Sequence, residues 1–329
     1  KIRNTAQSSA RPSRQELGGH EAARALEATM KTSTAAVTIL ESHGAFGGRL
    51  IRFAHESAAC KCTMKCGVFV PPERAEKFPV LYCLGGLTAS DVNWATKVST
   101  AQQAASDLGV MLVFPDTSPR EGAPDAEHPL LGYGASYYVD ATEEPYATNY
   151  QMCTYVTTEL PSVIEANFPA DSSRRSICGH SMGGHGALVC YLRAPYGYYA
   201  SCSAFAPVSN PSAIPLPAPA WRAFAAYLGG GGDAADEDAP WRSAWRAYDA
   251  CELVKTYDKG PIKIKVDQGK DDPKLEVLGP RRLVPAADAN KLVELDYSER
   301  DGYDHELAHF VASFAADHVK YHAAFLSSS

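Results

Sequence analysis

The chain has 329 residues, of which 45% are hydrophobic and 21% charged, with a formal net charge of −7. These proportions are typical of a globular protein with a sizeable core, and the length suits one large α/β domain or two ordinary ones. The negative charge argues against a nucleic acid or an anionic membrane as the main partner. No apolar run approaches the roughly 18 residues that would span a bilayer.

Residues 1–29 differ from the rest of the chain because they are polar and poor in apolar side chains. This composition predicts a mobile tail. Its arginines and serines resemble a transit peptide weakly, but Glu16, Glu21 and Glu27 count against that interpretation. Met30 is a candidate natural start, which would make the tail an upstream remnant, and neither start is followed by the apolar core of a secretory signal.

Nine cysteines, an odd number, are scattered through apparent core segments. Buried free thiols explain this usage better than a disulfide framework, which favours a reducing compartment such as the cytoplasm. The one cluster runs from Cys60 to Cys66, near His55, but lacks the paired C-x-x-C spacing of a zinc site. Alternate positions up to Val70 instead place cysteine, methionine and valine on one face of a strand. A core strand is therefore predicted here, and no metal site.

After Met30, short apolar runs bounded by turn residues alternate with helical patterns. The predicted strands span residues 34–40, 49–53, 60–70, 79–84, 110–114, 174–178, 201–205, 262–266 and 291–296. The predicted helices lie near residues 97–108, 148–167, 182–194, 221–227 and 307–325. This alternation predicts a mainly parallel sheet covered by helices on both faces. Pro211–Pro219 and Gly229–Pro240 are rich in turn residues and are predicted to be surface excursions.

The stretch Gly179-His180-Ser181-Met182-Gly183 matches the pattern G-x-S-x-G. A predicted strand ends just before it and a small-residue helix follows. In that context the pattern places its serine on a sharp, strained turn with the hydroxyl above the sheet. The N-terminus of the helix would favour negative charge developing there. Ser181 is therefore a predicted nucleophile.

A serine hydroxyl needs a base to become a good nucleophile, and two histidines lie inside the motif itself. The side chain of His180 should diverge from that of Ser181, its neighbour at the turn. His185 lies one helical turn further on, with no acid placed to orient it. Both are predicted to pack beneath the turn.

The base and its orienting acid are predicted further along the chain, because α/β hydrolases follow the order nucleophile, acid, histidine. A loop containing Asp267, Asp271 and Asp272 begins at the end of one predicted strand, and His305 follows the next. His305 is therefore the predicted base. Spacing alone does not choose among the three acids.

Two N–H donors are also needed to hold the oxyanion that forms during acyl transfer. One should be the amide of Met182, directly after the nucleophile. The other should come from the loop after the predicted strand that ends at Leu84, where Gly85 and Gly86 would let the backbone approach a substrate closely.

Eight motifs, in order along the chain, resemble those of the S-formylglutathione hydrolase family, also called esterase D. They are GGLTAS (85–90), PDTSPR (115–120), YVDAT (138–142), TNYQM (148–152), GHSMGGHGAL (179–188), SAFAP (203–207), DQGKDD (267–272) and GYDH (302–305). The similarity runs from about residue 40 to residue 326 and is far more specific than G-x-S-x-G alone.

The resemblance implies one α/β-hydrolase domain over residues 30–329, with a central, mostly parallel sheet and helices on both faces. It implies a cytosolic serine thioesterase of formaldehyde detoxification, which converts S-formylglutathione and water to formate and glutathione without a metal or an organic cofactor. It also suggests a homodimer. Carried over residue by residue, the family's catalytic triad is Ser181, Asp272 and His305, and its oxyanion amides are those of Leu87 and Met182.

The chain departs from the family at three places beside the site. Ala89 stands where the family often has cysteine, so a modifiable thiol is absent there. Pro129-Leu130-Leu131 stands where a Trp-Asp pair and an aromatic are common, and ELAHF after GYDH replaces a shorter, tyrosine-rich stretch. These differences touch the expected pocket walls, so acyl-group size and glutathione affinity are less firmly implied than hydrolysis.

Two alternative functions remain open from the sequence. A general carboxylesterase acting on short acyl esters would use the same fold and triad. A non-catalytic binding protein could keep the fold, but the intact Ser181, Asp272 and His305 argue against it.

Overall fold

The computed structural model describes residues 36–327, apart from residues 74, 129, 216–217, 234 and 237. The predicted tail at residues 1–29 and its boundary at Met30 lie outside the described residues. So does Pro129, one of the departures from the family pattern. Within the described residues, no helix is long and apolar enough to cross a membrane.

All nine predicted strands are present, with ends shifted by a few residues. They are β1 (Thr38–Ala45), β2 (Gly48–Ser57), β3 (Cys62–Val70), β4 (Phe78–Leu84), β5 (Met111–Pro115), β6 (Ala170–His180), β7 (Cys202–Phe205), β8 (Ile262–Gly269) and β9 (Val293–Arg300). They form one sheet in the order β1-β2-β3-β5-β4-β6-β7-β8-β9. Strands β1, β2 and β3 run antiparallel to their neighbours, whereas β5, β4, β6, β7, β8 and β9 are mutually parallel. The predicted mainly parallel sheet is confirmed.

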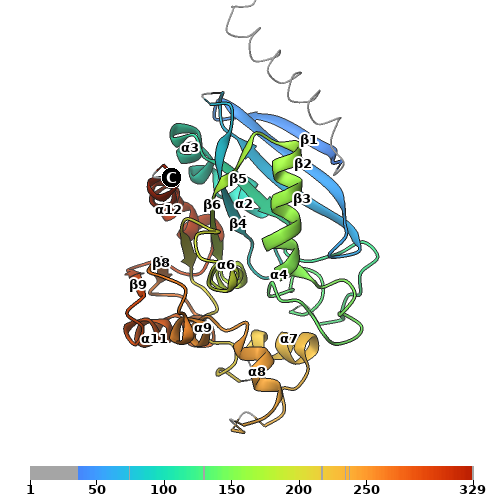
Figure 1. Ribbon diagram of the computed structural model, residues 1–329, viewed down its shortest axis with the longest axis vertical. Coiled ribbons are helices and arrows are strands. Elements are labelled where there is room, and N and C mark those ends of the chain that lie inside the picture. Colours follow the sequence, from blue (N-terminus) through green and yellow to red (C-terminus); the bar gives the residue numbers. More distant parts are fainter. Residues whose placement is uncertain are drawn as a thin grey trace, which may run out of the picture.

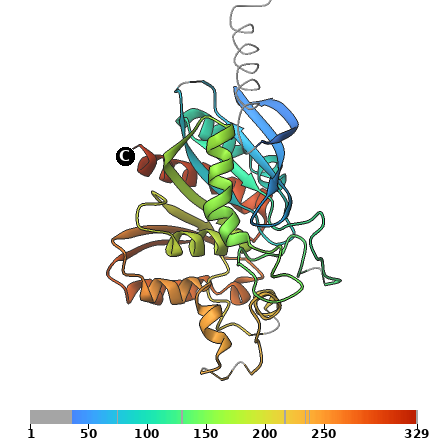
Figure 2. The same cartoon turned by 45° about the vertical axis from the view of Figure 1, so that its right-hand side comes forward.

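Helices cover both faces of this sheet (Figures 1 and 2). They are α2 (Asn93–Lys97), α3 (Ser99–Leu108), α4 (Met152–Thr154), η2 (Tyr155–Glu159), α5 (Leu160–Asn167), α6 (Met182–Arg193), α7 (Pro219–Leu228), α8 (Trp241–Arg246), α9 (Ala250–Thr256), α10 (Leu275–Leu278), η3 (Pro280–Arg282), α11 (Leu283–Asp288), η4 (Leu307–Val311) and α12 (Ala312–Leu326). Helices α3 and α12 pack together, and α6 packs on β6, β7 and α9.

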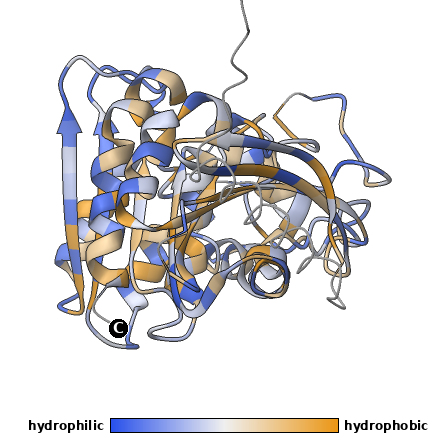
Figure 3. Ribbon diagram, turned by 90° about the horizontal axis from the view of Figure 1, so that it is seen from above, coloured by the Kyte–Doolittle hydropathy of each residue, from blue (hydrophilic) through white to orange (hydrophobic). Residues whose placement is uncertain are grey.

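The sheet is apolar because its parallel strands are covered on both faces. Strands β5 and β7 are buried at every position, and viewed from above the apolar strands lie between the helices (Figure 3). The parallel strands end at one edge of the sheet. The turns after β4, β6 and β8 therefore meet there, which is where ligands bind in open α/β sheets.

The cysteine-rich segment forms the predicted strand. In β3, Cys62, Met64 and Cys66 are buried while Thr63 and Lys65 between them are partly exposed. Cys60 is also buried but belongs to the turn before the strand. All nine cysteines are free and buried, as predicted from their scatter along the chain.

One of the two predicted surface excursions is wrong. Pro211, Ser212 and Ile214 are buried, because the carboxylate of Asp249 accepts hydrogen bonds from the amide and the hydroxyl of Ser212, at 2.9 and 2.7 Å. That anchor lies 37 residues further along the chain, so local composition gives no sign of it. Most described residues of Gly229–Pro240 are exposed, as predicted.

Candidate active site

Ser181 stands at the sharp turn between β6 and α6. Its backbone has φ 59° and ψ −118°, in the region that L-residues rarely adopt, so the strained turn expected from the motif is present. The neighbouring glycines permit it. A Cβ on Gly179 would overlap the carbonyl of Gly183, and a Cβ on Gly183 would overlap the carbonyl of Leu84. The turn is tied to β7 by the amide of Ser181, which donates to the carbonyl of Phe205 at 2.9 Å.

The structure brings together the three side chains of the predicted triad. Ser181 Oγ lies 2.9 Å from His305 Nε2, and His305 Nδ1 lies 2.7 Å from Asp272 Oδ2. All three residues are buried, with exposed fractions of 8%, 6% and 5%. A buried imidazole that links a hydroxyl to a carboxylate can accept the hydroxyl proton through Nε2 while the carboxylate holds Nδ1–H.

Asp272 is held as a carboxylate by three donors. Besides His305, its Oδ2 accepts from Gln268 Nε2 at 2.9 Å and its Oδ1 accepts from the amide of Lys274 at 2.7 Å. Burial alone would raise the pKa of Asp272. The hydrogen bonds and the charge interaction with His305 outweigh it, so this pKa lies below its ordinary value. Asp272 is therefore ionised at neutral pH.

The two other acids of the DQGKDD stretch point elsewhere. Asp267 is fully buried, and its Oδ2 pairs with Arg300 Nη2 at 2.9 Å. Asp271 is exposed. Only Asp272, of these three, contacts His305. His309, four residues after His305, is an exposed residue of η4 and makes no contact with the triad in the described residues.

The loop after β4 lies against the serine. A Cβ on Gly86 would come within 3.3 Å of Ser181 Cβ, which is tighter than most side-chain contacts, so a glycine favours this close approach. Two contacts anchor the loop: Tyr138 Oη donates to the carbonyl of Gly85 at 3.0 Å, and the amide of Thr88 donates to the carbonyl of Gly134 at 2.8 Å. Ala89, where the family often has cysteine, is buried in the same loop.

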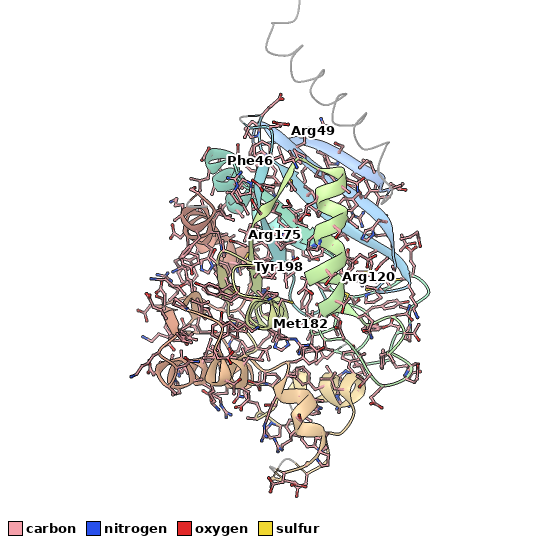
Figure 4. The ribbon with its side chains drawn as sticks, viewed as in Figure 1. Phe46, Arg49, Arg120, Arg175, Met182 and Tyr198 are labelled. Carbon is pink, nitrogen blue, oxygen red and sulfur yellow. The ribbon has the colours of Figure 1, made fainter. Side chains whose placement is uncertain are left out.

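Two amides near Ser181 are free to donate. Met182 is the first residue of α6 and lies in the interior of the molecule (Figure 4). Among the hydrogen bonds of the described residues, none uses the amide of Leu87 or of Met182. Unpaired N–H groups at a helix start and in a glycine loop are suited to receiving an anionic oxygen.

The two histidines of the motif are buried, as predicted, and neither touches the serine hydroxyl. His185 packs against Tyr137 and Phe224, with ring centroids 6.1 and 5.8 Å apart, and burial lowers its pKa to about 4. His180 lies beside His305, with ring centroids 4.7 Å apart. The sequence did not predict the contacts of His180 and Gln268 with the triad. His180 reaches a main-chain carbonyl, which every residue has, and Gln268 reaches Asp272 through a loop conformation that the residue spacing does not determine.

No three histidine, cysteine, aspartate or glutamate side chains converge as a metal site would require, within the part of the chain that the structure describes. The sulfur-containing side chains of β3 and of the turn before it make ordinary core contacts: Cys60 Sγ and Met152 Sδ are 3.8 Å apart, as are the sulfurs of Cys62 and Met64. The groups that the described residues bring together beside Ser181 are the imidazole of His305 and the carboxylate of Asp272.

Comparison with known proteins identifies close relatives. Residues 57–321 match the model of a family described as putative esterase. S-formylglutathione hydrolase of Rattus norvegicus is 44% identical over 300 residues, covering 88% of this chain and 98% of that protein. The Bos taurus protein of the same name is 43% identical over the same length. A solved structure of an S-formylglutathione hydrolase from Agrobacterium tumefaciens is 41% identical, with a TM-score of 0.79, and covers 88% of this chain and 99% of its own.

Proposed function

This chain belongs to the S-formylglutathione hydrolase family, and we propose that it hydrolyses S-formylglutathione to formate and glutathione with Ser181 as the nucleophile. The observation that carries the proposal is the hydrogen-bonded series Ser181–His305–Asp272, with distances of 2.9 and 2.7 Å. This series occurs in a chain with the α/β-hydrolase fold whose sequence is 44% identical to an S-formylglutathione hydrolase.

In the first step, Ser181 Oγ attacks the thioester carbonyl carbon while His305 Nε2 accepts the hydroxyl proton. Asp272 holds Nδ1–H and stabilises the imidazolium that forms. The tetrahedral intermediate collapses as the carbon–sulfur bond breaks, and His305 returns its proton to the departing sulfur. Glutathione leaves and Ser181 carries the formyl group as an ester.

In the second step, a water molecule takes the place of the thiol. His305 Nε2 accepts one water proton as the oxygen attacks the formyl carbon, and a second tetrahedral intermediate forms. Its collapse breaks the bond to Ser181 Oγ, which recovers the proton from His305. Formate is released and the enzyme returns to its starting state.

Both intermediates carry an oxyanion that the free amides of Leu87 and Met182 would hold. Each such donor is worth about 3 kcal/mol of barrier reduction. The close approach of Gly86 to Ser181 supports this assignment, since it brings the loop backbone to the side of the nucleophile. No step of the reaction requires a redox group, because an acyl transfer to water involves no change of oxidation state.

The test is hydrolysis of S-formylglutathione, followed by the loss of thioester absorbance and by direct measurement of formate and glutathione. We expect the two products in equal amounts and a kcat/KM that exceeds that for p-nitrophenyl acetate. A preference for the aryl ester by orders of magnitude would instead favour a general carboxylesterase. A chain that turned over neither substrate and took no fluorophosphonate label would be a binding protein.

Three finer assignments accompany this proposal. We propose a cytoplasmic location, supported by nine free and buried thiols that a reducing compartment would preserve. We propose a single α/β-hydrolase domain over residues 30–329 and a homodimer, both implied by the family resemblance. Size-exclusion chromatography with light scattering would test the dimer.

A further inference from the structure

His180 is a buried side chain that contacts the main chain of the proposed base. Its Nε2 lies 2.8 Å from the carbonyl oxygen of His305, across 125 residues of sequence. The two imidazole rings are tilted by 45° with centroids 4.7 Å apart. His180 is the last residue of β6, so it is carried by the same strand that places Ser181.

The contact fixes which nitrogen of His180 carries the proton. A carbonyl oxygen can only accept a hydrogen bond, so Nε2 of His180 must be protonated and donate. Burial, followed by the nearby His305, lowers the pKa of His180 well below its ordinary value. The ring is therefore neutral when His305 becomes charged during the reaction, and it does not repel the imidazolium.

The bond from His180 restrains the main chain of the loop that carries His305. His305 lies in the loop between β9, which ends at Arg300, and η4, which begins at Leu307. Among the hydrogen bonds of the described residues, the one from His180 is the only one that the His305 carbonyl accepts. A loop residue held at its side chain alone could rotate away from the serine, whereas a bond to its main chain limits that movement.

His180 also lies against the glycine loop. A Cβ on Gly86 would come within 3.3 Å of both His180 Nδ1 and Ser181 Cβ. One imidazole thus packs between the loop proposed to hold the oxyanion and the loop that carries the base. Its position is coupled to that of the nucleophile, because the two are adjacent residues.

We propose that His180 is a positioning residue that acts through His305: its Nε2–H holds the His305 main chain so that the imidazole stays between Ser181 and Asp272. The inference rests on the proposed role of His305. It predicts that catalysis depends on a donor at the Nε2 position and not simply on a buried polar ring.

The matched pair His180→Gln and His180→Asn separates these possibilities. A glutamine amide nitrogen can reach the place of Nε2, whereas the shorter asparagine places its amide near Nδ1 and leaves the His305 carbonyl without a donor. We expect H180N to lower kcat by about 10- to 100-fold with KM changed less than about 3-fold, since misplacement by 1 Å costs about 100-fold. We expect H180Q to recover to within about 5-fold of wild type.

A control variant separates positioning from loss of stability. His322 is also fully buried and hydrogen-bonds Ser201 and Ser203, at 2.8 and 2.7 Å, but it has no contact with the triad. We expect H322N to lower Tm at least as much as H180N while changing kcat less than about 3-fold. All variants are compared at a temperature well below the lowest Tm of the series, where circular dichroism shows that each is folded.

Two results would overturn the inference: a kcat of H180N within 3-fold of wild type, or a loss in H180Q equal to that in H180N. Measuring the series on p-nitrophenyl acetate as well as S-formylglutathione keeps the two proposals apart. If the wild type leaves the thioester intact, the proposed substrate is wrong, yet the aryl ester still tests His180.

Discussion

Replacing Asp272 by asparagine changes one atom and removes a charge from the centre of the site. The carboxylate accepts three hydrogen bonds: from His305 Nδ1 at 2.7 Å, from Gln268 Nε2 at 2.9 Å and from the amide of Lys274 at 2.7 Å. An asparagine offers one acceptor oxygen and one donor nitrogen, so it cannot satisfy all three. Whichever way the amide turns, its NH₂ faces at least one other donor.

Each orientation of the asparagine harms catalysis in a different way. With the amide nitrogen at the Oδ2 position, His305 Nδ1 must accept, its proton moves to Nε2, and Nε2 can no longer accept the proton of Ser181. With the nitrogen at the Oδ1 position, the tautomer is kept but the amide faces the N–H of Lys274, and no negative charge stabilises the imidazolium. In chymotrypsin-like proteases the equivalent change lowers kcat about 10⁴-fold, close to 5.5 kcal/mol, and we expect a loss of similar size here.

The assay is kcat for S-formylglutathione, measured for the wild type, D272N and D271N. Asp271 is adjacent and exposed, so D271N makes the same chemical change without touching His305 and should keep kcat within about 2-fold. Thermal unfolding of both variants checks that the fold is intact. The reasoning is refuted if D272N retains more than about 10% of wild-type kcat, because the carboxylate would then not be needed to orient or stabilise His305.

Three further predictions concern the contacts of Asp272 and Asp267. Gln268→Leu removes one donor from Asp272 and should lower kcat about 10-fold at unchanged KM, whereas an unchanged kcat would show that the amide of Lys274 suffices. Asp267→Asn removes the charge that pairs with half-buried Arg300 at 2.9 Å and with buried His318 at 3.3 Å, and it should lower the free energy of unfolding by at most about 3 kcal/mol in urea titrations, with kcat within about 3-fold; a large loss of kcat would place Asp267 in the reaction instead. Burial alone would raise the pKa values of Asp272 and Asp267, but His305 beside the first and His318 beside the second lower them in the folded state. The stability that these carboxylates contribute is therefore present above the ordinary aspartate pKa and is lost as pH falls through the lowered values. The urea concentration at the unfolding midpoint should therefore fall as the pH is lowered below about 4. A midpoint that stayed constant over that range would contradict the lowered pKa values.

The strands could be predicted because most are short apolar runs that the fold buries on both faces. Strand β1 is the instructive exception: it was expected at residues 34–40 and forms at Thr38–Ala45. It lies at the edge of the sheet and is largely exposed, so its side chains carry no periodic signal. Helices α2, α8, α9, α10 and α11 were not predicted at all. They have four to seven residues each, too few for a helical period to appear.

The residues of the site likewise fall into two groups: those that a contiguous motif predicts and those whose contacts are distant in the sequence. Ser181 could be predicted because the motif and its strand-to-helix context are contiguous. The choice of Asp272 over Asp267 needed the family resemblance, because both acids follow the same buried run. In the structure Asp267 still belongs to β8 and pairs with Arg300, while Asp272 lies past the strand end. The bond from His180 to the His305 carbonyl could not be predicted, since any residue at 305 offers the same main-chain acceptor.

The central claim is that Ser181 carries the formyl group, and the most direct measurement is the turnover of S-formylglutathione by Ser181→Ala. Loss of a triad serine lowers kcat about 10⁶-fold in a comparable hydrolase, so we predict a variant with no turnover above background and with an unchanged Tm. Fluorophosphonate should label the wild type on the peptide that contains Ser181 and leave the variant unlabelled. A folded Ser181→Ala variant that hydrolysed the thioester at more than about 1% of the wild-type rate would contradict the account.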